Sequence, residues 1–165
     1  VEGETAGAAL TSLLAIEYLD EKESLVLVNG DQLLDYDENE LVKFFVKSDA
    51  DAGVFVFNSF HPRWSYVRTD KDGLVIEAAE KRPISNQATA GFYYYKKTFE
   101  YIKSAKKMIL KGGDVDGLYY ICPVFNEMIL EQKKILTYSI DSKKYHSFMS
   151  SEKVKEFEKT NLCLS

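Results

Sequence analysis

The chain has 165 residues, of which 45% are hydrophobic and 28% are charged, a balance typical of a globular domain rather than of a fibrous or disordered chain. Its 21 basic residues against 26 acidic ones give a net charge of −5, which argues against a general nucleic-acid binder with a basic face. No apolar run approaches the roughly 18–20 residues of a membrane span, so we expect a soluble protein that does not insert into a membrane. The two cysteines form no disulfide framework, which favours a cytoplasmic location.

The first third of the chain alternates helical patterns with short apolar runs. In chain order, the predicted elements are a helix over Thr5–Leu19, a strand over Ser24–Val28, a helix from Asp37 or Glu38 to Ser48, and a strand over Val54–Phe57. The two strands are short and apolar, which is typical of strands buried on both faces of a parallel sheet. This order of elements predicts an α/β layered domain.

The rest of the chain predicts a hairpin followed by further strands and helices. A strong turn signal, Asp70-Lys71-Asp72-Gly73, separates the two strands of the hairpin. The predicted elements are strands over Trp64–Thr69, Leu74–Ala78 and Thr89–Tyr95, helices over Phe99–Ile109 and Phe125–Leu130, strands over Ile135–Ile140 and Tyr145–Met149, and a terminal helix capped by Ser151. No repeat or linker divides the chain, so we expect a single domain over residues 1–165 with a mixed sheet.

The segment Asn29-Gly30-Asp31-Gln32 directly follows a predicted buried strand. In open α/β sheets, ligands bind beyond the carboxyl ends of the strands, where Asp31 would lie. Gly30 would allow a ligand to approach the backbone, and a carboxylate there suits magnesium, which prefers oxygen ligands. The alternative is that Asp31 only caps a turn.

A second polar cluster follows the predicted hairpin. Glu80 could accept hydrogen bonds from sugar hydroxyls, and Lys81 could hold a phosphate as a point charge. Asn86 lies in the polar loop that follows, and Gly91 near the next strand indicates either a close approach to a ligand or a bulge. A solvated charge cluster before a proline-containing loop is the alternative for Glu80 and Lys81.

Other chemically capable residues show no recognisable catalytic pattern. Trp64, the only tryptophan, can stack on a base or a sugar, although packing within the hairpin is the commoner role. His61 and His146 lack an accompanying triad or metal-binding helix motif. Cys122 and Cys163 have no metal or disulfide spacing, and we expect free thiols.

Several of these segments occur in the order in which a known family carries them. They are Gly7-Ala8-Ala9, Leu27–Gln32, Trp64–Arg68, Glu80–Asn86, Ala88–Tyr93 and Pro123–Ile129. On these segments the chain resembles the sugar-1-phosphate nucleotidylyltransferases, and most of all the subgroup of bacterial capsule and lipopolysaccharide biosynthesis. The resemblance implies a Rossmann-like nucleotide-diphospho-sugar transferase fold with a mixed, mostly parallel sheet.

The resemblance also implies an activity. A sugar-1-phosphate oxygen would attack the α-phosphate of a nucleoside triphosphate, with Mg²⁺ as cofactor, to give a nucleotide sugar and pyrophosphate for surface polysaccharide synthesis. It implies that Asp31 is the metal ligand, that Lys81 holds the sugar phosphate, and that both are catalytic residues. The implied substrate-binding positions are Gly3, Gly7, Gly30, Trp64, Glu80, Asn86 and Gly91. Nothing in the pattern decides the oligomeric state, and a homo-oligomer stays open.

Two departures from the family pattern leave alternatives open. The Gly-rich loop that grips the triphosphate is absent, so we expect a fragment that lacks its N-terminal βα unit. The stretch from Tyr145 to Glu152 also lacks the second metal-binding Asp of some relatives, so that either His146 partly replaces it or the metal site is weakened or lost. The alternatives are an A-type glycosyltransferase that uses a nucleotide-sugar donor, or a non-catalytic relative that binds a sugar nucleotide.

Overall fold

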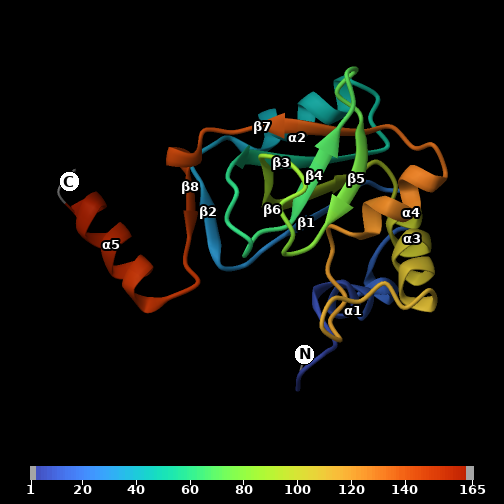
Figure 1. Cartoon of the computed structure of the whole chain (residues 1–165), viewed down its shortest axis with the longest axis horizontal. Helices are drawn as coiled ribbons and strands as arrows, with labels where there is room; N and C mark the ends of the chain where they lie inside the picture. Colours follow the sequence, from blue (N-terminus) through green and yellow to red (C-terminus); the bar gives the residue numbers. More distant parts are fainter. Residues whose placement is uncertain (1–2, 163–165) are drawn as a thin grey trace.

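A six-stranded mixed sheet forms the centre of the computed structural model, which describes residues 3–162 (Figure 1). The strands of this sheet are β1 Leu25–Val28, β3 Ala52–Asn58, β4 Tyr66–Thr69, β5 Val75–Ala79, β6 Gln87–Tyr95 and β7 Ile135–Ser139. The helices and 3₁₀ turns are α1 Ala8–Leu13, η1 Ile16–Tyr18, α2 Glu38–Lys47, α3 Thr98–Leu110, α4 Val124–Leu130, η2 Ser142–Lys144 and α5 Ser151–Leu162. None of the helices in the described part of the chain is long and apolar enough to cross a membrane.

The long strand β6 organises the sheet. It runs antiparallel to β3 along one edge, and to β4 and then β1 along the other. Among the described strands, β3 and β7 are the one parallel neighbouring pair. The predicted α/β fold with a mixed sheet is confirmed. β1, β3, β4 and β7 all point the same way, as expected for a mostly parallel sheet, but β6 separates β1 from β3.

The sheet is covered on both faces, as its alternating side chains require. Val54 and Val56 of β3 pack in a core with residues of α1, α3 and α4, whereas Phe55 and Phe57 pack in a second core with α2. The aromatic run of β6 alternates in the same way, with Tyr93 on the first face and Tyr94 on the second. These tyrosines therefore help to build the two cores of the domain.

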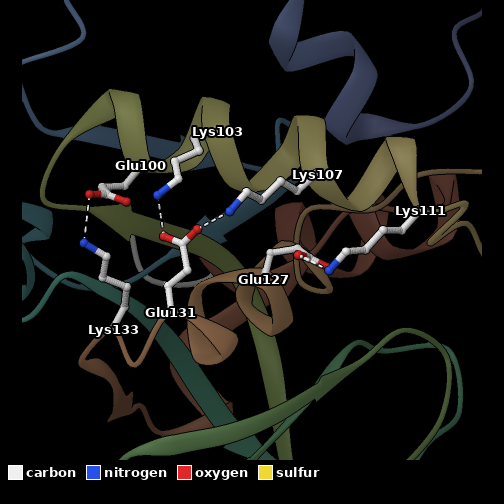
Figure 2. A network of polar contacts seen from close by, with 7 residues as sticks. All are labelled: Glu100, Lys103, Lys107, Lys111, Glu127, Glu131 and Lys133. Atoms are coloured by element: carbon white, nitrogen blue, oxygen red, sulfur yellow. Dashed lines mark hydrogen bonds and ion pairs between the residues drawn. The ribbon is translucent and has the colours of Figure 1, made fainter.

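The predicted hairpin is present as β4 and β5, and its edge is held by α4. The side chain of Asn126 accepts a hydrogen bond from the Ala78 amide at 2.9 Å and donates one to the Ala78 carbonyl at 2.8 Å. Helix α4 is in turn held against α3 by pairs of lysines and glutamates, seen in Figure 2. These contacts fix the hairpin edge, which would otherwise present unpaired backbone groups.

Three local predictions differ from the structure. The helix predicted over Thr5–Leu19 is two shorter pieces, α1 and η1, because Gly7 with φ 104° precedes α1 and the backbone leaves the α-helical region at Ala15. The strand at Ser24–Val28 is not buried between parallel neighbours, since β1 pairs antiparallel with β6 and Val28 is 49% exposed.

The third difference is a small ribbon at the side of the sheet. The predicted strand at Tyr145–Met149 is the shorter β8, Tyr145–Ser147, which pairs antiparallel with β2, Gln32–Leu34. No strand was expected at Gln32–Leu34. The predicted terminal helix is present as α5, which lies beyond this ribbon, on the side away from α3 and α4 (Figure 1).

Candidate active site

The end of the hairpin places the first candidate residue. Tyr66 of β4 pairs with Ala79 of β5, so one step further along the ladder brings Ser65 opposite Glu80. The Ser65 hydroxyl donates a hydrogen bond to Oε2 of Glu80. Burial raises the pKa of the Glu80 carboxyl, while the Ser65 hydrogen bond and the charge of Lys81 act in the opposite direction. Glu80 is thus a half-buried carboxyl held by a neutral donor.

A left-handed backbone turn places Lys81 beside Glu80. Neighbouring side chains of an extended strand point to opposite faces, but Lys81 has φ 51°, and both side chains line one cleft. The Lys81 ammonium donates a hydrogen bond to the Tyr120 hydroxyl at 2.7 Å and lies 5.0 Å from the centre of the Tyr120 ring. This hydrogen bond raises the pKa of Lys81, which therefore stays cationic at neutral pH.

The loop after β1 brings Asp31 to the same cleft. The backbone amide of Asn29 donates to the Gly91 carbonyl at 2.9 Å, and the amide of Phe148 donates to the Asp31 carbonyl at 2.7 Å. The backbone of Asp31 is therefore anchored while its side chain stays exposed. Burial and then the charge of Asp31 raise the pKa of Tyr145 to about 12.

A bulge in β6 completes this side of the cleft. Val54 and Val56 of β3 oppose Tyr93 and Thr89, so β6 holds two extra residues between these pairs, and Gly91 has φ 61°. A Cβ atom on Gly91 would lie only 2.3 Å from the side-chain nitrogen of Asn29. The bulge alternative for Gly91 is therefore correct, and glycine is needed there.

These elements enclose a cleft of about 400 Å³. It brings together five of the residues singled out from the sequence: Asp31, Trp64, Glu80, Lys81 and Gly91. Trp64 packs edge-on against Phe57 at 5.4 Å between ring centres, so it combines the packing role with a place in the cleft wall.

The other predicted positions lie elsewhere. Asn86 is exposed, outside the cleft lining, and its carbonyl accepts a hydrogen bond from the Ser59 amide. Gly3 and Gly30 have open space around them, and Gly7 packs against the backbone of Tyr119, where a Cβ atom would meet the carbonyl oxygen at 2.4 Å. Gly7 is thus required for packing and places its neighbour Ala8 in the cleft wall.

Several cleft residues were not found from the sequence. Arg63 lines the cleft with its guanidinium 4.3 Å from the centre of the Trp64 ring, and its position beside the only tryptophan was a usable signal. Ser65 and Tyr120 carry no local signal, because their partners lie 15 and 39 residues away along the chain. Ser147 lines the cleft through the β2–β8 pairing.

The C-terminal ribbon lies beside Asp31 but adds no second carboxylate there. Ser147 and Met149 reach the cleft, whereas His146 is outside its lining, with its ring 4.9 Å from that of Phe157. Since His146 lies outside the cleft that contains Asp31, the suggestion that it replaces a metal ligand there is wrong. Within residues 3–162, no group of three His, Cys, Asp or Glu side chains could hold a metal ion.

The structure is an α/β domain with a cleft that gathers polar side chains from separate segments, and comparison with known proteins assigns the family. The chain belongs to the nucleotidyl transferase family, whose sequence pattern matches residues 1–123. No curated protein matches the chain.

Solved structures share the fold. A nucleoside-diphosphate-sugar pyrophosphorylase from Vibrio cholerae RC9 is 22% identical with a TM-score of 0.80, over 95% of this chain and 66% of that one. A protein assigned as a glucose-1-phosphate thymidylyltransferase from Bacillus anthracis, solved with sucrose, is 19% identical with a TM-score of 0.69, over 93% of this chain and 61% of that one. The chain thus spans less than two thirds of the length of both solved chains.

Proposed function

We propose that this nucleotidyl transferase joins a nucleoside triphosphate to a sugar-1-phosphate. An oxygen of the sugar phosphate forms a bond to the α-phosphorus, the bond between the α-phosphorus and the bridging oxygen breaks, and pyrophosphate leaves. The products are a nucleotide sugar and pyrophosphate. The observation that carries this proposal is the convergence of Asp31 with the neighbouring Glu80 and Lys81, from two separate segments, on one cleft.

Each polar residue of the cleft has a role in substrate binding that follows from the chemistry of its side chain. The Glu80 carboxylate accepts hydrogen bonds from sugar hydroxyls, and the Lys81 ammonium neutralises the sugar phosphate. The Arg63 guanidinium is a second cation on the cleft wall, suited to a phosphate oxygen. Because phosphoryl transfer needs little covalent chemistry from the protein, holding the two substrates in line and balancing their charge supplies most of the acceleration.

A divalent cation fits this site with Asp31 as its protein ligand. The described residues offer no three-residue cluster, but magnesium commonly takes one or two carboxylates and completes its shell with substrate phosphates and water. When bound, the metal neutralises charge on the phosphate oxygens. Asp31 itself provides an exposed carboxylate on an anchored backbone.

We also propose that the nucleotide sugar supplies surface polysaccharide synthesis from the cytoplasm. The support is the ordered set of motifs that resembles the capsule and lipopolysaccharide subgroup. The chemistry of the cleft is independent of this assignment, which depends on the sugar and base that the protein selects.

The test is an assay of pyrophosphate release by the full-length protein. Each nucleoside triphosphate is combined with each of a panel of sugar-1-phosphates, with magnesium or with a chelator. We expect release only when both substrates and magnesium are present, and formation of the nucleotide sugar in equal amount. Pyrophosphate release that does not require a sugar-1-phosphate would contradict the proposal.

One observation favours a second function, binding of a sugar nucleotide without turnover. The ribbon beside Asp31 carries Ser147 and Met149, so a second carboxylate is not supplied from that side. Calorimetric titration with nucleotide sugars, run alongside the pyrophosphate assay, separates the two functions. Binding of a nucleotide sugar with no release from any substrate pair would support the second.

A further inference from the structure

The residue that controls the orientation of Glu80 comes from the opposite strand of the hairpin. Ser65 lies one step beyond the Tyr66–Ala79 pair, and its hydroxyl donates to Oε2 of Glu80. Cross-strand neighbours in an antiparallel ladder lie close enough for such a contact. The hydrogen bond is therefore built into the register of β4 and β5.

Ser65 is itself held firmly by the sheet. Its carbonyl accepts a hydrogen bond from the Thr89 amide at 2.8 Å, which ties the start of β4 to β6. Thr89 also lines the cleft, and its hydroxyl lies 3.0 Å from the Tyr93 hydroxyl. With this backbone anchored, the position of the serine oxygen depends on the Cα–Cβ torsion alone, and the hydroxyl donates to Glu80.

Glu80 has few other groups to orient it. Its second oxygen, Oε1, accepts no hydrogen bond from the described residues, so it is available to a ligand in the cleft. Around the carboxyl lie the cation Lys81 and the buried, neutral Tyr93 and Cys122, whose pKa values burial raises well above their usual range. Ser65 is thus the neutral donor that determines which oxygen faces the cleft.

We propose that Ser65 is a positioning residue that holds Glu80 with one oxygen directed at the substrate, and thereby sets the selectivity for the hydroxyl pattern of the sugar-1-phosphate. This role rests on the proposed function. A site built to hydrogen-bond a substrate hydroxyl rejects an analogue that lacks it, because the buried acceptor is left unpaired. Selectivity of that kind requires an acceptor with one fixed orientation, which the Ser65 hydroxyl supplies.

The first test reads the hydrogen bond directly and needs no activity. Carbon-13-labelled glutamate in the full-length protein is titrated by NMR, with Glu80→Gln used to assign the Glu80 signal. We expect Ser65→Ala to raise the pKa of Glu80, because a donor to its ionised form is lost, and Ser65→Thr to leave it near the wild-type value. Ser104→Ala, which removes a buried hydroxyl in α3, is the control and leaves Glu80 unchanged. An unchanged Glu80 titration in Ser65→Ala overturns the inference.

The second test reads selectivity. KM and kcat are measured for the preferred sugar-1-phosphate and for its epimers and deoxy analogues. We expect Ser65→Ala to raise the KM of the preferred sugar on the order of tenfold, the value of one hydrogen bond to a charged group, with a smaller change in kcat. Discrimination against the deoxy analogue falls, and the acid limb of kcat/KM moves to higher pH.

The outcomes separate the two proposals. If the wild-type protein releases pyrophosphate but Ser65→Ala keeps its KM and its discrimination, only the positioning role is wrong. If the wild-type protein neither binds nor uses any sugar-1-phosphate, the proposed function fails, and the selectivity role fails with it. Recovery of both readouts in Ser65→Thr supports the inference, because a merely structural role would not depend on a hydroxyl.

Discussion

The cleft and the contact between α3 and α4 arrange their lysine and glutamate side chains in opposite ways. Between α3 and α4 they pair with one another, as Figure 2 shows. In the cleft, the neighbouring Glu80 and Lys81 are each hydrogen-bonded to a neutral hydroxyl, that of Ser65 and that of Tyr120. Opposite charges that pair with each other stabilise the contact between two helices. A charge that is hydrogen-bonded only to a neutral group is not neutralised, so it can still interact with a charged or polar ligand.

The helical network consists of three neighbouring groups of close ion pairs. Its contacts are Lys103 to Glu131 at 2.5 Å, Lys107 to the other oxygen of Glu131, Lys111 to Glu127 at 2.7 Å, and Lys133 to Glu100 at 2.8 Å. Since α4 also holds the edge of β5 through Asn126, this network supports the strand that directly precedes Glu80. The helical network and the cleft are therefore linked through α4 and β5. We nevertheless expect mutations in the cleft to change activity and mutations in the network to change stability.

The largest effect is expected at Asp31 in the cleft. Asp31→Asn keeps the size of the side chain and removes its charge, so pyrophosphate release at limiting magnesium should fall by roughly 100-fold or more. Stability to urea should stay near that of wild type, because Asp31 is exposed. Asp72→Asn at the exposed hairpin turn is the matched control. Full turnover of Asp31→Asn at limiting magnesium would show that the metal assignment is wrong.

The next effect is expected at Lys81. Lys81→Ala removes the cation that Tyr120 holds, so the KM for the sugar-1-phosphate should rise about 10- to 100-fold while the KM for the nucleoside triphosphate changes little. Lys71→Ala, in the exposed hairpin turn, serves as the control. Equal changes in both KM values would place Lys81 outside the sugar-phosphate site.

A smaller effect, on stability alone, is expected in the helical network. Hydrogen bonds from Lys103 and Lys107 lower the pKa of Glu131 to about 2, so this stabilisation is present above about pH 4.5 and is lost as the pH falls toward 2. Glu131→Gln should cost about 1 kcal/mol in urea unfolding near neutral pH. The difference from wild type should shrink in acid, with activity unchanged.

The control for this network is an exposed pair. Glu40→Gln removes the partner of Lys43 in α2, where both side chains are more than half exposed. It should leave the free energy of unfolding nearly unchanged, because solvent screens the attraction between the two charges. If Glu40→Gln and Glu131→Gln gave equal losses, the comparison between a linked network and an isolated surface pair would fail.

The smallest effect is expected to be a gain. The buried hydroxyl of Ser104 in α3 has no hydrogen-bond partner among the described residues, so Ser104→Ala should stabilise the protein by about 0.5–1 kcal/mol. Ser12→Ala is the opposite case, because the Ser12 hydroxyl bonds the Ala9 carbonyl at 2.8 Å and the Tyr101 hydroxyl. Urea unfolding of both variants should give changes of opposite sign.

The elements with strong local patterns were predicted well. The apolar run at Val54–Phe57, the turn at Asp70–Gly73 and the amphipathic pattern at Phe99–Ile109 each appear as expected. The strand β2 was missed because it has only three residues and its partner, β8, is more than a hundred residues away. The prediction that β1 has parallel neighbours was wrong, because a short apolar run has the same sequence pattern in a parallel and in an antiparallel sheet.

The sequence by itself determined the class of fold and three polar positions, Asp31, Glu80 and Lys81, because period, turn chemistry and motif order are local properties. Only the tertiary structure decided what those positions contact. The register of β4 and β5 brings Ser65 to Glu80, and the left-handed backbone conformation of Lys81 lets its side chain reach Tyr120. The bulge at Gly91 leaves room for the side chain of Asn29. Such contacts depend on chain segments far apart in sequence, whose closeness results from packing the whole domain.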